Sequence, residues 1–332
     1  MRIIALAFGA IVMALGVTTA AGAAGKDVKL SLAAYSTPRE AYAKLIPMFQ
    51  ATPAGGGVSF TQSYGASGDQ ARAVQAGLQA DIVALSLAPD VDTLVKAGLV
   101  DRNWSKQSYR GMVTDSLVVF AVRDGNPKHI KGWDDLLKPG VQVITPNPFT
   151  SGGARWNVIA AYGAWLKLGK TKVQARAKLL HLFQHVAVQD KSARDALNTF
   201  LSGKGDVLLT YENEAIGAQL AGQKLQYVIP RSTILIENPV AVLKSGSHKD
   251  KANQFVRFLK TPAAQQVFAD RGYRPVVRSV LEANRKRFPV RPGQFTINQL
   301  GLGGWETVQR VFFDPDSGVM AAIEKKVGGV AG

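Results

Sequence analysis

The chain has 332 residues, no cysteine, and 40 Lys and Arg residues against 24 Asp and Glu, which gives a formal net charge of +16. The lack of cysteine excludes disulfide bonds, thiolate metal sites and cysteine nucleophiles. The length favours two lobes over one core, and the basic charge suits nucleic acid, an anionic membrane or a small anion as partner.

The N-terminus has the three parts of a secretory signal peptide. Met1 and Arg2 precede an apolar run over 3–17, and small residues follow it. The run is shorter than the roughly 20 residues that span a bilayer. We therefore expect residues 1–24 to be a signal peptide, cleaved near Ala23 or Ala24, and the mature chain to be exported.

The positive charges are dispersed along the chain. The densest runs, 167–178 and 285–291, lack the interleaved aromatic residues of a surface that binds nucleic-acid strands. We interpret them as solvated faces and expect no nucleic-acid partner.

Strand-like apolar runs alternate with helical runs, which indicates an α/β architecture with mostly parallel strands. We expect strands over 28–35, 58–64, 81–88, 116–123, 141–145, 186–188, 206–210 and 233–243. The expected helices lie between them and beyond the last one, at 37–50, 67–79, 89–98, 133–137, 154–168, 171–185, after Ser192, after Tyr211, and at 249–260 and 261–270.

The junction at Ser151 is the most informative motif. A strand stops at a Pro-rich turn, and a helix begins at Ser151, Gly152 and Gly153. Glycines let an anion approach the main chain, while the positive end of the helix dipole and the serine hydroxyl attract it. Alone, such a sequence is more often an ordinary helix cap.

The pattern recurs, because four further strands end in small or polar residues where a helix begins. These are Ser36 with Thr37, Ser67 with Gly68, Ser192 with Ala193, and Tyr211. Ligands in open α/β sheets bind beyond the carboxyl ends of strands, so these points can converge. Main-chain N–H groups and hydroxyls dominate the set, which suits a fully deprotonated tetrahedral dianion that needs donors and offers no proton.

Several blocks resemble the sulfate-binding proteins of bacterial ABC importers, in family order. The strongest is 147–157, which keeps Ser-Gly-Gly-Ala-Arg-Trp-Asn, and the others are 125–128, 138–141, 206–208 with 212–214, and 295–297 with 303–305. The resemblance implies a type II periplasmic-binding-protein fold: α/β and bilobal, with two mixed-sheet lobes joined by two crossover segments. We expect residues 26–113 with 240–332 to form one lobe, and 114–239 the other.

The resemblance also implies a function. It predicts a periplasmic protein, a monomer without cofactor or catalytic residues, that captures sulfate in the cleft between the lobes and delivers it to an inner-membrane ABC permease. Other tetrahedral oxyanions, such as thiosulfate or molybdate, remain alternative ligands. An exported phosphate-ester or sulfate-ester hydrolase remains the alternative of another class.

Carried onto this sequence, the family pattern assigns roles to individual residues. Ser67 donates through its main chain and hydroxyl, and Ser151, Gly152 and Gly153 are the central donors. Ala193 and the position of Ser36 supply main-chain N–H groups, and Tyr211 stands where well-known members carry a Trp. A phenol can accept as well as donate, so this departure puts strict preference for the unprotonated ion in doubt.

Two arginines and two histidines complete the set of candidates. Arg155 and Arg194 lie just inside helices whose first residues donate, where they can orient peptide dipoles or simply lie at the surface. His181 and His185 have helical metal-ligand spacing, but the intervening residues lack the Glu of a metalloprotease motif, so we expect no metal site there.

Overall fold

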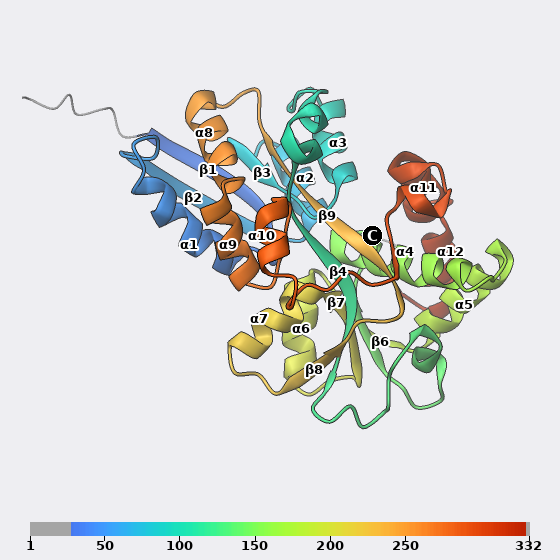
Figure 1. The fold of residues 1–332 in the computed structure, drawn as a ribbon. Coiled ribbons are helices and arrows are strands. Elements are labelled where there is room, and N and C mark those ends of the chain that lie inside the picture. The colour runs from blue at the N-terminus through green and yellow to red at the C-terminus, as the bar shows by residue number, and fades with distance from the viewer. Residues whose placement is uncertain (1–27, 330–332) are drawn as a thin grey trace, which may run out of the picture.

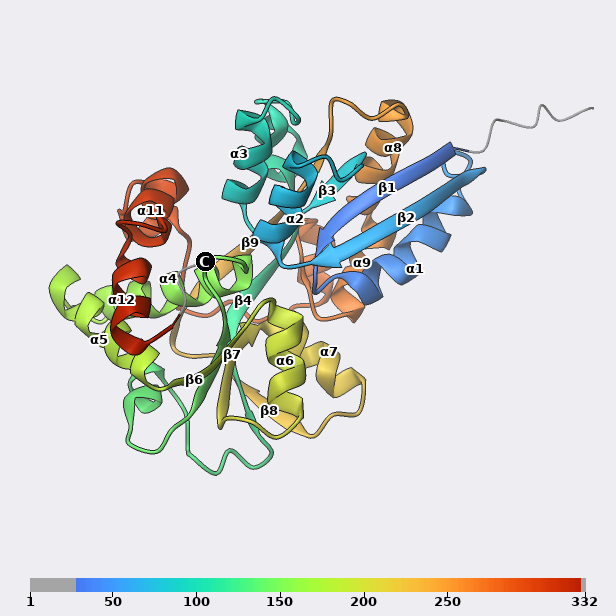
Figure 2. The same cartoon turned by 180° about the vertical axis from the view of Figure 1, so that it is seen from behind.

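The computed structural model describes residues 28–329, and the signal peptide expected over 1–24 lies outside them. The strands form a curled mixed sheet in the order β2-β1-β3-β9-β4-β7-β5-β6, with helices on both faces (Figure 1, Figure 2). Within residues 28–329, no helix combines the length and apolarity needed to cross a bilayer. The sheet divides into two lobes.

The first lobe is built around β1, which pairs in parallel with β2 and with β3. Its helices pack on both faces of these strands, and its core includes Phe49, Phe255 and Phe268. Its elements are β1 (Val28–Tyr35), α1 (Arg39–Gln50), β2 (Val58–Gly65), α2 (Ser67–Gln75), β3 (Ile82–Ala84), α3 (Ala88–Lys96), η1 (Trp104–Lys106), η2 (Ser108–Gly111), α8 (Lys249–Leu259), α9 (Pro262–Asp270) and α10 (Arg278–Ala283).

The second lobe is built around β5 and β7, which run parallel to each other, with β6 parallel to β5 at the edge. Its elements are η3 (Trp133–Leu137), β5 (Val143–Pro146), α4 (Gly152–Lys167), α5 (Lys172–Gln184), β6 (Val186–Asp190), α6 (Ala193–Leu201), β7 (Val207–Tyr211), α7 (Glu212–Leu220) and β8 (Leu225–Val228). This alternation of strands and helices agrees with the order expected from the sequence.

Two long antiparallel strands, β4 (Met112–Arg123) and β9 (Ser232–Val242), connect the lobes. The amino-terminal part of β4 pairs with β9 and with the short strand β10 (Arg274–Pro275), whereas its carboxyl-terminal part pairs with β7 and β8. Similarly, β9 pairs with β3 only through its last residues. A small change of twist in these two strands would therefore move one lobe relative to the other.

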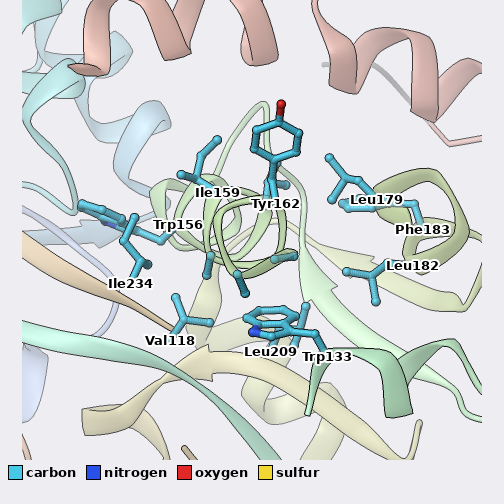
Figure 3. Close-up of a cluster of buried hydrophobic side chains, with 14 of the residues drawn as sticks. Val118, Trp133, Trp156, Ile159, Tyr162, Leu179, Leu182, Phe183, Leu209 and Ile234 are labelled. Carbon is cyan, nitrogen blue, oxygen red and sulfur yellow. The ribbon is translucent and has the colours of Figure 1, made fainter. Parts of the chain in front are cut away.

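Helix α4 lies at the centre of the second lobe. Every residue from Gly152 to Trp165 is buried, as expected for a helix that is apolar on most sides. Figure 3 shows Trp156 beside Ile234 of β9 and Tyr162 on the side of α4 opposite Val118 of β4 and Leu209 of β7, all in one buried cluster that also includes residues of α5. This packing holds the start of α4 in a fixed position.

The C-terminal segment wraps onto the second lobe. Strand β11 (Gly293–Phe295) pairs with β9, and η4 (Asn298–Leu300) leads to α11 (Gly304–Phe313) and α12 (Val319–Val327), which packs on α5. The ring of Phe312 lies 4.8 Å from that of Tyr162. Our division of the sequence placed this segment with the other lobe, and that division as a whole stays a prediction.

Two of the expected elements take a different form in the structure. The strand expected over 81–88 is only Ile82–Ala84, because the ladders with β1 and β9 end at Ala84, one more N–H, from Leu85, binds the carbonyl of Pro239, and the chain then bends at Ser86. The helix expected over 133–137 is a 3-10 helix. It ends before Pro139, which disfavours helical geometry at the preceding residue.

Candidate anion-binding site

Three helices from the two lobes begin with residues that the sequence predicted as donors. Ser67 is the first residue of α2, Gly152 and Gly153 are the first two of α4, and Ala193 is the first of α6. The first N–H groups of a helix have no acceptor inside it and carry the positive end of its dipole. All four residues are buried.

The start of α4 is the point where these elements meet. A Cβ atom on Gly153 would lie 3.2 Å from the Tyr211 hydroxyl oxygen and 3.3 Å from the Cβ of Ala193. A Cβ atom on Gly152 would lie 2.2 Å from Cδ2 of Leu87 and 2.5 Å from Oγ of Ser86, both in the first lobe. Only glycine fits here, and the lobes are in the closed arrangement.

Ser86, which we did not predict, links the two lobes at this point. Its Oγ shares a 2.6 Å hydrogen bond with the hydroxyl of Tyr211, and its N–H donates to Oγ of Ser67 at 2.9 Å. Its carbonyl accepts from the side chains of Trp156 and Asn238. The sequence did not single it out, because Ser86 lies inside the strand expected over 81–88, whereas the observed strand ends at Ala84.

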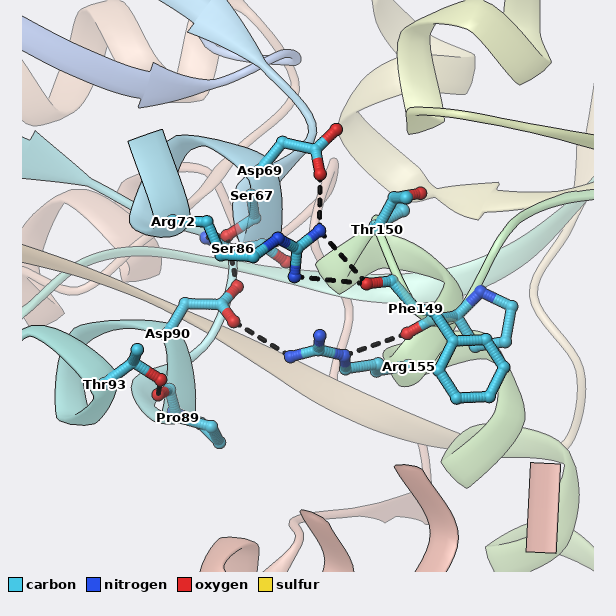
Figure 4. A network of polar contacts seen from close by, with 12 residues as sticks. Ser67, Asp69, Arg72, Ser86, Pro89, Asp90, Thr93, Phe149, Thr150 and Arg155 are labelled. Carbon is cyan, nitrogen blue, oxygen red and sulfur yellow. Dashed lines mark hydrogen bonds and ion pairs between the residues drawn. The ribbon is translucent and has the colours of Figure 1, made fainter. Parts of the chain in front are cut away.

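A buried network of hydrogen bonds holds the Ser67 side chain in place (Figure 4). The Ser67 hydroxyl donates to Oδ2 of Asp90 at 2.6 Å, and Nη1 of Arg155 donates to Oδ1 of the same carboxylate at 2.9 Å. Arg155 also donates from Nε to the carbonyl of Pro148, in the turn before α4. Because its hydroxyl proton is directed at Asp90, the donor role expected of Ser67 narrows to its main-chain N–H.

The serines that precede α4 and α6 act as helix caps. Oγ of Ser151 accepts from the N–H of Ala154 at 3.4 Å, and Oγ of Ser192 accepts from that of Asp195 at 3.2 Å. A hydroxyl that accepts one bond can still donate its own proton to a ligand. Ser192 donates its proton to the Asp195 carboxylate, at 2.7 Å. Of these two serines, Ser151 is therefore better placed to donate its hydroxyl proton to a ligand.

Arg194 joins the lobes on the other side of the site. Its guanidinium donates to both oxygens of Glu40 on α1, at 2.6 and 3.0 Å, and to both oxygens of Glu214 on α7, at 2.9 Å each. It also reaches the carbonyl of Thr37 at 3.2 Å. These contacts, like those of Arg155, suit the predicted role of orienting peptide groups.

The two carboxylates bound by Arg194 differ in burial, and their pKa values move in opposite directions. Burial raises the pKa of Glu214, even though Arg194 opposes that shift. Partial burial also acts to raise the pKa of Glu40, but hydrogen bonds and charge from Arg194 outweigh it and lower that pKa. Arg194 therefore binds one buried and one half-exposed carboxylate.

Ser36 makes fewer contacts with the donor residues around Gly152 and Gly153. It is partly buried in the turn between β1 and α1, and the contacts are made by its neighbours. The ring of Tyr35 lies 6.1 Å from that of Tyr211, and the Thr37 carbonyl binds Arg194. The structure thus brings Ser67, Gly152, Gly153, Ala193 and Tyr211 together and places Ser36 beside them.

A cavity of about 260 Å³ opens next to this point. Thr37, Glu40, Arg194, Asn213 and Tyr273 contribute to its walls, together with apolar residues of α6 and α7. Within residues 28–329, this cavity included, no group of three or more His, Asp or Glu side chains is arranged to hold a metal ion. The chemistry gathered between the lobes is hydrogen-bond donation.

Burial also sets the ionisation of the phenol. Desolvation raises the pKa of Tyr211 well above its ordinary value of 10.0, and the bond to Ser86 opposes this only in part. Tyr211 therefore stays protonated at neutral pH and keeps a proton to donate.

Comparison with known proteins agrees with this fold and these motifs. Residues 30–274 match the family model described as bacterial extracellular solute-binding protein. A sulfate-binding protein of Synechococcus elongatus is 41% identical over 94% of this chain and 91% of its own length. A thiosulfate-binding protein of Pseudomonas aeruginosa is 35% identical, over 95% and 98%.

Among solved structures, the sulfate-binding protein SubI from Mycobacterium tuberculosis H37Rv superposes with a TM-score of 0.83 at 42% identity, covering 86% of this chain and all of that one. This match confirms the type II periplasmic-binding-protein fold predicted from the sequence. The family match covers most of the chain, and the identity to individual relatives extends over nearly all of it. The chain therefore belongs to the bacterial extracellular solute-binding protein family.

Proposed function

We propose that this protein captures sulfate between its two lobes in the periplasm and delivers it to an inner-membrane ABC permease. The observation that carries the proposal is the convergence of the starts of α2, α4 and α6 with Tyr211, from both lobes, on Gly152 and Gly153. Relatives that match nearly the full length of the chain are named sulfate-binding proteins. Export depends on the signal peptide expected over residues 1–24.

In the proposed complex, neutral donors hold the anion. They are the main-chain N–H groups of Ser67, Gly152, Gly153 and Ala193, together with the hydroxyls of Ser151 and Tyr211. Ser36 contributes its main-chain N–H from the neighbouring turn. Hydrogen bonds to a charged group are worth about 1.5 to 3 kcal/mol each, so several of them, less desolvation, can provide the roughly −8 kcal/mol of a micromolar complex.

The carboxylates near the site support selectivity for an ion without a proton. Both oxygens of Asp90 already accept hydrogen bonds, from Ser67 and Arg155, and both oxygens of Glu214 accept from Arg194. Hydrogen phosphate needs an acceptor for its proton, and these groups are committed to other partners. The proposed site therefore favours sulfate over hydrogen phosphate.

Closure of the lobes is the proposed signal to the permease. Donors from α2 in the first lobe and from α4 and α6 in the second can reach one anion together only when the lobes meet. Hinge motion in β4 and β9 gives that closure, which is a common mechanism in folds that enclose a ligand between two lobes. On this proposal the protein acts as a carrier and performs no catalysis.

Calorimetry and thermal unfolding of exhaustively dialysed protein test the proposal with sulfate, selenate, thiosulfate, molybdate and phosphate. Sulfate at about 100 times its dissociation constant should stabilise the fold by roughly 2.7 kcal/mol, and phosphate should have little effect. Equal stabilisation by all five anions, or by none, contradicts selective capture.

Thiosulfate is the second candidate ligand, and Tyr211 is the observation that favours it. Its hydroxyl shares a hydrogen bond with Ser86, so it can be turned to suit a ligand with one sulfur in place of an oxygen. The P. aeruginosa relative is named for thiosulfate. A dissociation constant for thiosulfate at or below that of sulfate in the same titrations would establish this alternative.

A further inference from the structure

Two imidazole rings face each other at the end of α5, away from the anion site. His181 lies in the last turn of the helix, and His185 is its C-terminal cap residue. Their Nε2 atoms are 3.4 Å apart, and their ring centroids are 5.1 Å apart. His181 is exposed and His185 is half-buried, so solvent and ions reach the pair.

The tautomer of His185 follows from its other ring nitrogen. Nδ1 lies 3.0 Å from the carbonyl oxygen of Val141, which can only accept a hydrogen bond. Nδ1 therefore carries the proton, and in the neutral ring Nε2 presents a lone pair toward His181. A backbone carbonyl bound to the far nitrogen is the arrangement that orients many metal-ligating histidines.

The separation of the two nitrogens matches a metal coordination sphere. Two imidazole nitrogens bound at 2.0 to 2.1 Å with a tetrahedral angle between them lie about 3.3 to 3.4 Å apart. The observed separation of 3.4 Å lies at the upper end of that range. Without a metal ion, Nε2–H of His181 donates a hydrogen bond to Nε2 of His185 across this distance, and a bound metal ion would take the place of that proton.

The surroundings also favour a cation. The carboxyl end of a helix carries the negative end of its dipole, and both histidines lie there. The nearest lysine on the same helix, Lys178, is already paired with Asp134 at 2.9 Å. Leu179, Leu182 and Phe183 point toward α4 and hold the helix in place, as seen in Figure 3.

We propose, in contrast to the expectation from the sequence, that His181 and His185 form a two-histidine surface site for a divalent transition-metal ion, with water completing its coordination. Imidazole suits Zn²⁺, Ni²⁺ and Cu²⁺, and the usual affinity series places Cu²⁺ first. The site is separate from the groups that surround Gly152, so sulfate and metal should bind independently.

Isothermal titration of tag-free, chelator-treated protein with Ni²⁺ and Zn²⁺ tests this assignment. The chain has four histidines, which allows a matched pair of variants: H181N with H185N, and H129N with H248N as the control. We expect about one equivalent of either metal in the wild type and in the control. We expect at least about a tenfold loss of affinity in the H181N/H185N variant, and no binding of Mg²⁺.

Sulfate titration of each variant shows that it is folded, because sulfate affinity should not change. Failure of the wild type to bind Ni²⁺ or Zn²⁺ would overturn the assignment. Equal metal affinity in both double variants would do so as well, since the binding would then lie elsewhere. Loss of binding in the control alone would move the site to His129 or His248.

Discussion

Among the ion pairs that join the two lobes, the Arg155–Asp90 and Arg194–Glu40 pairs differ in burial. The Arg155 and Asp90 side chains are 9% and 4% exposed, whereas those of Arg194 and Glu40 are 26% and 49% exposed. The first pair is bound into the donor site, because Asp90 also holds the Ser67 hydroxyl. The second lies at the rim, where Arg194 also binds the Thr37 carbonyl and the Glu214 carboxylate.

The contrast shows which contacts should control ligand capture. Removing one partner of a buried ion pair leaves an uncompensated charge out of water, which costs several kcal/mol. An exposed pair is worth about 0 to 1 kcal/mol, because water and salt screen it. We therefore expect affinity to depend on the interior of the site and only weakly on the rim.

The largest effect is expected where the lobes meet most closely. Gly152→Val should abolish sulfate binding, because even its Cβ would overlap Leu87 and Ser86 in the closed arrangement. Calorimetry measures the loss, and thermal unfolding without ligand checks that the fold survives. Gly217→Ala is the matched control, since its Cβ would meet no atom within 4 Å. Wild-type affinity in the valine variant would place the site elsewhere.

Asp90→Asn should weaken sulfate binding by about 2 to 4 kcal/mol, because closure would bury Arg155 without its counter-charge. Asp92→Asn, on the same helix, is the control. That carboxylate accepts from Trp104 within the first lobe and should matter little. Equal effects of the two substitutions, measured by sulfate titration, would remove the special role of the buried pair.

Tyr211→Phe should weaken sulfate binding by about 1 kcal/mol, since it removes one donor and leaves Oγ of Ser86 without that partner. The ratio of sulfate to thiosulfate affinity is the second readout, and it should change if the hydroxyl contacts the ligand. Because burial keeps the phenol protonated, wild-type affinity should stay level between pH 7 and pH 9. Tyr109→Phe, at an exposed position, is the control.

Glu40→Gln should have the smallest effect, about 0.2 to 1 kcal/mol, which disappears at high salt. The pKa of Glu40 is lowered in the closed form. The stabilisation of the closed form by ionised Glu40 is therefore complete above pH 4.5, the ordinary pKa, and is lost as the pH falls through the lowered pKa. Sulfate titrations from pH 7 to pH 3.5 check this. An effect of Glu40→Gln as large as that of Asp90→Asn would break the contrast between rim and interior.

The alternation of strands and helices was predictable because each carries a local signal. A buried strand followed by Ser151 and two glycines indicates a capped helix start, and the structure has one there. The segment after α9 was harder to assign. Strand β11 has only three residues, which is too short for an alternating pattern to mark it. Helix α11 begins at Gly303 and Gly304, whose positive φ angles belong to a turn, so no apolar periodicity marks the helix start.

The site was predictable where the motif itself supplies the groups and not where a distant partner completes them. Asp90 binds Arg155 across 65 positions of sequence, and Ser86 reaches Tyr211 across 125. Nothing local to Asp90 distinguishes it from the neighbouring Asp92. Such pairings depend on how two lobes close, which hydrophobic periodicity does not encode.

A crystal structure of the sulfate complex tests the central claim most directly. We predict the sulfur atom between the starts of α2, α4 and α6, with oxygens bound by the N–H groups of Gly152, Gly153 and Ala193 and by Tyr211, and with no Lys or Arg side chain touching the ion. Sulfate bound instead to the guanidinium of Arg194, in the adjoining cavity, would contradict the account.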